Sequence, residues 1–218
     1  MQFKTKEEQV ADFLREGIIS GRFARGARLK QQEIATLLNT SITPVREALK
    51  LLEAEGYVAG DSFKGAVVAP FDIEASSEVL SLRILLETQL VKGAVERAKG
   101  ADIAELKVMA EAFAAAFDAG DNETARAANY RFHHRLFEVA AMPQTLHFVQ
   151  ILWARYPFDL INRLSGRVSR AAQEHDDMLA AIIAGDTSAA MLATRQHIEA
   201  GFVELRDSLE TGVSKVGK

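Results

Sequence analysis

Hydrophobic residues between positions 31 and 58 recur at the spacing of two short amphipathic helices. The two apolar stripes are Ile34, Leu37 and Leu38, followed by Val45, Leu49 and Leu52. A polar break at residues 39–41 separates the stripes and is suited to a tight turn. Ser41 can cap the second helix, and Pro44 then falls in its first turn, where a missing N–H group costs little. The segment therefore predicts a helix-turn-helix.

The polar face of the second helix carries groups suited to DNA. If the apolar stripe is buried, the opposite face presents a methyl-bearing side chain, a hydroxyl and two cations: Ile42, Thr43, Arg46 and Lys50. Such a face fits a helix that lies in the major groove. Two β-prone runs follow at residues 57–59 and 66–68, and the connection between them, with glycine at each end, predicts a hairpin wing. The alternative is a short helical hairpin with a purely structural ribbon.

Beyond the wing, the periodicity is helical throughout. Pro70 marks the boundary, because a proline disfavours helical continuation from the residue before it. Helices are expected at about 73–99, 102–119, 122–141, 143–155, 168–184 and 187–208, with a seventh candidate around 157–165. We therefore predict a mainly α protein. It has an N-terminal winged helix-turn-helix domain over residues 1–70 and a C-terminal all-α bundle of six or seven helices over residues 71–218.

Charge confines the expected DNA surface to one end of the chain. The formal net charge is −4 overall, but residues 1–69 carry a net +1 and residues 70–218 a net −5. Between positions 20 and 52, only Glu33 and Glu47 offset six basic residues, namely Arg22, Arg25, Arg28, Lys30, Arg46 and Lys50. This basic patch suits phosphate contacts, whereas the acidic remainder disfavours wrapping of DNA around the whole molecule.

Composition excludes several other classes of protein. The chain has no cysteine, which excludes disulfides, thiolate zinc sites and cysteine redox sensing. No apolar run approaches the roughly 20 residues that cross a membrane. The first seven residues also lack the apolar core of a signal peptide. We therefore expect a cytoplasmic protein with no membrane partner.

Three histidines are spaced so that they can meet inside the bundle. His133 follows Asn129 by four residues, so both side chains project from one helical face. His175 and His197 stand 10 and 12 residues from the turn at 185–186, on the two arms of a helical hairpin. Antiparallel arms bring both to nearly the same height, about 15–18 Å from the turn. Three imidazoles and an amide oxygen can ligate Zn²⁺, Ni²⁺ or Mn²⁺; the alternative is a set of polar core residues.

The first third of the chain carries a set of motifs in register: residues 18–21 (IISG), Gly26 with Leu29, Glu33 with Ala35, and above all residues 43–49 (TPVREAL). With these motifs it resembles the winged-helix domain of the GntR family of bacterial transcriptional regulators. The resemblance implies a homodimer that reads a pseudo-palindromic operator in double-stranded DNA, with Arg46 at a base edge and Gly65 in the minor groove. Gln32 and Ile42 stand where the family often has arginine. The expected DNA surface comprises Arg28, Gln32, Ser41, Ile42, Thr43, Arg46, Lys50, Lys64 and Gly65.

The second part of the chain contains four notable segments: residues 82–87 (LRILLE), Asn129 to His133, Glu174-His175 with residues 181–186 (AIIAGD), and His197. With these segments it resembles the FCD effector domain of FadR-type members of the same family. The resemblance implies a metal site made of an aspartate and three histidines, and this chain has Asn129 in place of the aspartate. It also implies a small carboxylate effector, for which Arg83 and Arg126 are the candidate contacts. The alternative for Arg83 is an ion pair with Glu87, one helical turn away.

These features together predict a metabolite-responsive transcriptional regulator, a repressor rather than an enzyme. One rival is a metal-dependent enzyme that uses His133, His175 and His197 to activate water. No general base is evident beside that ligand set, and an enzyme would leave the DNA-binding segment unexplained. A second rival is a pure metalloregulator, in which the metal ion itself changes the affinity for DNA.

Overall fold

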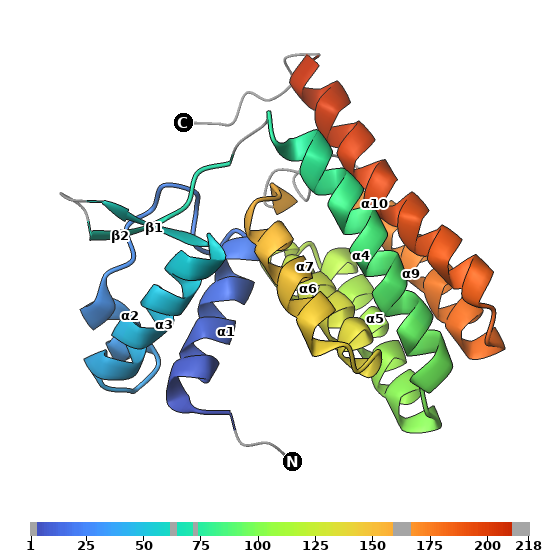
Figure 1. Cartoon of the computed structure of the whole chain (residues 1–218), viewed down its shortest axis with the longest axis horizontal. Coiled ribbons are helices and arrows are strands. Elements are labelled where there is room, and N and C mark those ends of the chain that lie inside the picture. Colours follow the sequence, from blue (N-terminus) through green and yellow to red (C-terminus); the bar gives the residue numbers. More distant parts are fainter. Residues whose placement is uncertain (1–3, 62–64, 72–73, 159–166, 211–218) are drawn as a thin grey trace.

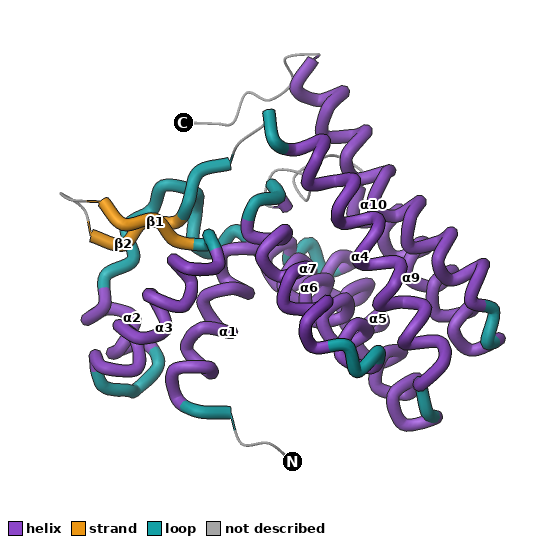
Figure 2. The backbone as a smooth tube through the Cα atoms, in the orientation of Figure 1, coloured by secondary structure: helices purple, strands orange, loops and turns teal. Residues whose placement is uncertain are grey.

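The computed structural model describes residues 4–61, 65–71, 74–158 and 167–210, and its elements form two groups (Figures 1 and 2). The first group, here called the winged-helix part, contains α1 (Lys6–Ile19), α2 (Gln31–Leu37), α3 (Ile42–Glu55), β1 (Val58–Asp61) and β2 (Gly65–Val68). The second group, here called the bundle, contains α4 (Ser76–Arg97), α5 (Gly100–Asp118), α6 (Asn122–Val139), α7 (Pro143–Ala154), α9 (Arg167–Ala184) and α10 (Thr187–Glu210). The predicted fold class is confirmed; the exact domain boundary at residue 70 stays a prediction.

The helix-turn-helix is formed by α2 and α3. Val45, Leu49 and Leu52 are buried, as the apolar stripe predicted, and α3 ends at Gly56, whose φ of 86° favours glycine. The first stripe was partly wrong, because Leu37 is 64% exposed and Ile34 is packed together with Ala35 instead. Ser41 does occupy the N-cap position of α3, but its side chain accepts no hydrogen bond from the described backbone of that helix.

The wing is a two-stranded antiparallel hairpin, in which Val58 pairs with Val68 and Asp61 with Gly65. A preceding segment lies along it, since the amide of Leu29 donates to the Ala66 carbonyl at 2.9 Å. This backbone contact places Arg28, which bridges to the wing, at the edge of the ribbon. The hairpin reading of residues 57–68 is therefore confirmed for the described residues.

The bundle packs antiparallel helices around α4, with α10 and α7 against it and α5 and α6 paired beside it (Figure 1). Aspartate and glycine mark two of these helix ends. Asp121 caps α6 through the amide of Thr124, and Gly185, with φ of 69°, turns the chain from α9 into α10. The seventh helix expected around residues 157–165 lies outside the described residues, apart from its first two positions. A bilayer-spanning helix is not found among the described residues.

The two parts of the chain share one hydrophobic core and a set of polar contacts. The guanidinium of Arg25 donates to the carbonyls of Ala69, Ala154 and Tyr156 at 3.0–3.1 Å. The hydroxyl of Tyr57 donates to the Gln150 carbonyl at 2.8 Å. Apart from the Arg25 bond to Ala69, these donors of the winged-helix part satisfy backbone acceptors in the last turns of α7 and just after it, so the two parts are held together at that point.

Candidate functional site

The candidate DNA-reading face of α3 is exposed to solvent. Ile42, Thr43, Arg46 and Lys50 all lie on it, and Ile42 is 41% exposed although it is apolar. The carboxylate of Glu47 contacts both cations, at 3.2 Å from Lys50 Nζ and 3.3 Å from Arg46 Nε. The hydrogen bonds from Lys50 and then Arg46 lower the pKa of Glu47 below its usual value. Glu47 therefore holds the two cations on this face in the absence of DNA.

The other expected DNA contacts are only partly placed. Arg28, Gln32 and Ser41 are exposed, and Gly65 begins β2. Lys64 lies outside the described residues.

Two cations of the predicted basic patch have a different role. The guanidinium of Arg22 pairs with Glu123 of α6 at 2.8 Å, and Arg25 donates to carbonyls as described above. Both side chains contact the bundle, although Arg22 remains exposed whereas Arg25 is half-buried. Lys30 is exposed, although it pairs with Glu33 at 2.6 Å. The basic patch identified in the sequence therefore includes two cations, Arg22 and Arg25, that contact the bundle.

The three predicted histidines converge inside the bundle. One ring nitrogen from each of His133, His175 and His197 lies within 4.8 Å of those of the other two. His133 comes from α6, His175 from α9 and His197 from α10, and the first two are buried. The Nε2 atoms of His133 and His175 are 3.1 Å apart, within hydrogen-bond distance. Two nitrogens bound to one Zn²⁺ at about 2.0–2.1 Å in a tetrahedron would lie roughly 3.3–3.4 Å apart, which is close to this separation.

The surroundings of the histidines also suit a metal ligand set. Nδ1 of His197 contacts the Glu174 carboxylate at 2.6 Å, which leaves its Nε2 as the ligating atom. Oδ1 of Asn129 is buried and accepts no hydrogen bond from the described residues. A buried carbonyl oxygen without a donor is costly, and a cation would satisfy it. Asn129, His133, His175 and His197 thus fit a divalent metal ion.

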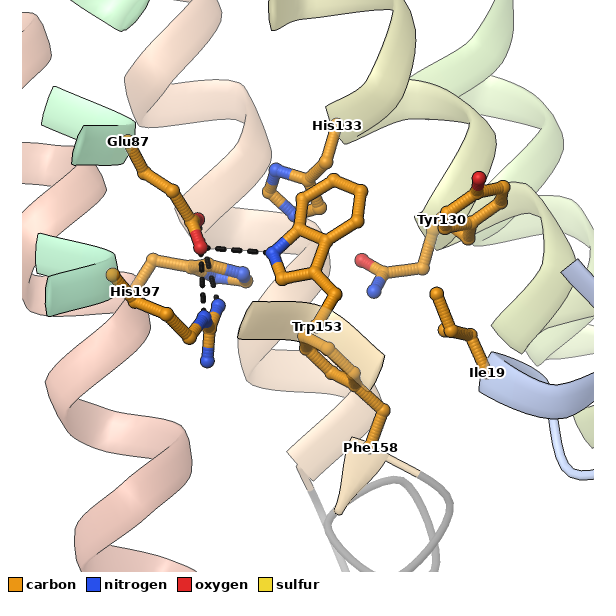
Figure 3. A pocket seen from close by; sticks show the side chains of 9 residues that line it. Ile19, Glu87, Tyr130, His133, Trp153, Phe158 and His197 are labelled. Atoms are coloured by element: carbon orange, nitrogen blue, oxygen red, sulfur yellow. Dashed lines mark hydrogen bonds and ion pairs between the residues drawn. The ribbon is translucent and has the colours of Figure 1, made fainter. Parts of the chain in front are cut away.

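A small cavity adjoins this cluster (Figure 3). Its walls include Asn129 and His133 of α6, His197 of α10, and Arg83 and Glu87 of α4. The cavity measures about 20 Å³, and a space of ~10–15 Å³ admits one water molecule. In this conformation it therefore has room for an ion or a water, but not for a larger organic acid.

Arg83 forms the predicted ion pair with Glu87 and also lines the cavity. Its Nε lies 2.7 Å from Glu87 Oε1, and both side chains are buried, so the i,i+4 ion pair is present. The same carboxylate oxygen accepts a hydrogen bond from Trp153 Nε1 at 2.8 Å (Figure 3). The guanidinium stacks over the rings of Tyr156 and Phe158, at 4.1 and 4.8 Å from their centroids. Arg83 therefore lines the cavity while it is neutralised by Glu87.

Arg126 is placed elsewhere. It is half-buried on α6, and its Nε donates to the backbone carbonyl of Ser20, directly after α1. It is not among the residues that line the cavity. Conversely, sequence reasoning did not assign the orienting contact of Glu174 or the lining role of Ile19. The position of Glu174 next to His175 in the sequence could have indicated its contact with the histidine cluster. Nothing in the sequence around Ile19 indicates that it lines the cavity, because it belongs to the other part of the chain.

An exposed cationic helix in a winged helix-turn-helix, joined to a helical bundle, defines a DNA-binding transcriptional regulator. Residues 6–68 match the profile described as "Bacterial regulatory proteins, gntR family", and residues 78–200 match the FCD domain. The chain belongs to the GntR family of bacterial transcriptional regulators, among the members that carry an FCD domain.

Individual relatives support this assignment. The HTH-type transcriptional regulator McbR of Escherichia coli K12 is 30% identical over 160 residues, which cover 71% of this chain and 72% of McbR. The HTH-type transcriptional repressor GlaR of the same organism is 28% identical over 198 residues, covering 85% and 89%. The solved structure of E. coli McbR/YncC superposes with a TM-score of 0.82 at 25% identity, covering 95% of this chain and 100% of that one. These relatives are regulators, and the enzyme alternative is set aside.

Proposed function

We propose that this protein is a ligand-responsive repressor that binds a pseudo-palindromic operator as a homodimer in the cytoplasm. A divalent metal ion (Zn²⁺, Ni²⁺ or Mn²⁺) and a small carboxylate in the bundle control its affinity for DNA. The metal ligands are Asn129, His133, His175 and His197. Arg83 is the cation that receives the carboxylate.

One observation carries the ligand part of the proposal. Asn129, whose buried Oδ1 accepts no hydrogen bond from the described residues, lines a cavity together with His133, His197 and the Arg83–Glu87 pair. Buried polar groups normally find partners, so a cavity that collects an unpaired oxygen, imidazoles and a guanidinium is suited to a polar ligand. The repressor assignment is supported by GlaR, which is named a repressor.

Neighbouring residues of the chain orient the histidines and contribute charge to the site. Glu174 fixes the orientation of the His197 ring, and Phe132 stacks on His175 with 4.5 Å between ring centroids. When bound, the metal ion would supply a positive charge that attracts an anion. Arg83 would add a second positive charge if the carboxylate competes with Glu87 for its guanidinium.

Trp153 provides a direct test. It is the only tryptophan of the chain and it lines the cavity, so its fluorescence reports on the site. We would titrate metal-stripped protein with Zn²⁺, Ni²⁺ or Mn²⁺, with and without citrate, and repeat the titration by calorimetry. We expect saturable metal binding, and citrate should strengthen it. If no ion binds at micromolar concentration in either case, the histidines are polar core residues and the proposed site is wrong.

Matched variants separate the site from the rest of the protein. His175→Ala should abolish metal and citrate binding, while binding to DNA selected in vitro persists. His147→Ala removes an exposed histidine of α7, outside the cluster, and should leave both unchanged. If metal alone alters DNA affinity and citrate adds nothing, the protein is a pure metalloregulator.

A further inference from the structure

The bundle alone does not close the cavity. Ile19, the last residue of α1 in the winged-helix part, also lines it and is 4% exposed. Figure 3 shows Ile19 on α1 below Tyr130 of α6, at the side of the cavity away from His197. The other lining residues lie between positions 83 and 197. One wall of a candidate ligand site therefore belongs to the part of the chain that carries the DNA-reading helix.

Polar contacts hold this wall in place. Two of them join the end of α1 to α6: Arg131 Nε to Glu16 Oε2 at 2.7 Å, and Arg126 Nε to the Ser20 carbonyl. Along α1 these contacts fall on either side of Ile19, and along α6 they fall on either side of Asn129. The turn of α6 that carries the candidate amide ligand is thus the turn on which α1 is docked.

The cavity is so small that one of its walls must move to admit a larger ligand. About 20 Å³ accommodates an ion or a water, so an organic acid bound in addition needs more room. The walls from α4, α6, α7 and α10 belong to one packed bundle, and close-packed interiors resist expansion. The contact between α1 and α6 is a junction between two parts of the chain, and such junctions shift more readily than a core.

We propose that Ile19 is a wall of the ligand site and that an organic acid larger than the metal ion binds by displacing it, which moves α1 relative to α6. This inference rests on the proposed function, because it requires a ligand in the cavity. Displacement of α1 changes the placement of α3 and thereby couples the ligand site to DNA. The coupling is reciprocal, so bound operator changes ligand affinity by the factor by which ligand changes operator affinity.

A first experiment tests whether Ile19 is a wall and needs no ligand. Ile19→Ala and Ile18→Ala remove the same atoms from adjacent, buried isoleucines, but Ile18 does not line the cavity. In metal-free protein, acrylamide should quench Trp153 at least twofold more efficiently in Ile19→Ala than in wild type, and equally in Ile18→Ala and wild type. Equal quenching in the two variants overturns the assignment. Ile19→Val and Ile18→Val form a milder pair if either alanine variant does not fold.

A second experiment tests displacement. The chain has no cysteine, so Glu16→Cys with Arg131→Cys can be bridged by a short bis-maleimide that fixes α1 on α6. The same double variant without the bridge is the control. Zn²⁺ should bind both forms within twofold, whereas citrate, with Zn²⁺ present, should bind the bridged form at least tenfold more weakly. The bridge should weaken acetate binding less than citrate binding, because acetate needs less room.

The outcomes are distinguishable. Equal binding of citrate to bridged and unbridged protein overturns the displacement of Ile19. If neither Zn²⁺ nor either acid binds wild type, the proposed function fails and the displacement fails with it. The quenching comparison still decides whether Ile19 closes the cavity.

Discussion

Asn129 determines the charge of the candidate metal site. Three neutral imidazoles and an amide leave a divalent ion with its full charge, whereas an aspartate would cancel part of it. Asn129 lines the cavity and its buried oxygen accepts no hydrogen bond from the described residues, so a ligand that enters the site is expected to contact it. The amide therefore favours a site in which metal and anion reinforce each other.

Asn129→Asp should tighten the metal and weaken the carboxylate. The added negative charge attracts the ion and repels an incoming anion. We would measure Zn²⁺ and citrate affinities by calorimetry. Asn122→Asp makes the same charge change at the exposed start of α6 and should alter neither affinity by more than about twofold. A parallel gain or parallel loss of both affinities in Asn129→Asp would contradict this account.

Arg46 is expected to read a base edge, with Lys50 acting mainly on the phosphate backbone. Arg46→Ala should cost about 1–3 kcal/mol at the operator and relax discrimination at one base pair in each half-site. Lys50→Ala should weaken all sequences similarly. Each variant removes one of the two partners of Glu47, so the loss of an ion pair with Glu47 is the same in both variants. Selection from random DNA gives the measurement, and unchanged discrimination in Arg46→Ala would show that another face reads the bases.

At the scale of elements, the sequence predicted helices better than it predicted which surfaces meet. Helix ends were found within a few residues because glycine and aspartate mark them locally, as at Gly185 and Asp121. Leu37 was assigned to the core because apolar periodicity cannot show whether a neighbouring surface exists to cover it. Among the described residues Leu37 stays exposed, and α2 buries Ile34 and Ala35 instead.

The histidine cluster was predictable for the same local reason. Helical spacing and one antiparallel hairpin were enough to bring His133, His175 and His197 together. The role of Ile19 was not predictable, since its contact with the cavity joins residues more than 60 positions apart and leaves no periodic signal. Arg25 is a similar case, because its carbonyl acceptors lie up to 131 positions away.

The segment between α1 and α2 contributes more to the junction through Arg25 than through Arg22. Arg25→Ala removes donors to three carbonyls and should lower the free energy of unfolding by about 2–4 kcal/mol. The Arg22–Glu123 pair has side chains that are 40% and 49% exposed, and Arg22→Ala should cost at most about 1 kcal/mol because water screens such a pair. Urea denaturation compares the two variants. Equal losses would mean that Arg25 does not hold the junction.

At the scale of the whole molecule, the proposed homodimer predicts how operator spacing affects binding. Two recognition helices related by a two-fold axis meet the same face of DNA when half-sites are about one helical turn, or 34–36 Å, apart. Inserting about 5 bp between the half-sites rotates one to the opposite face and should reduce affinity to that of a single half-site. Inserting a full turn should restore part of it. Gel shifts with these duplexes provide the measurement, and indifference to spacing would indicate that one chain binds alone.

The docking of Arg25 against the bundle also has a consequence for ions released into solution. Each protein cation that neutralises a phosphate frees counterions from the DNA. Each such contact adds about −0.9 to the slope of log affinity plotted against log salt concentration. While the two parts are docked, the carbonyl acceptors engage Arg25 of each chain, so a dimer forfeits two such cations and its slope should be roughly 2 smaller in magnitude than the full basic patch would give. If the parts separate on the operator, these arginines become available and the slope steepens. A salt titration of operator binding therefore reports whether the protein opens when it meets DNA.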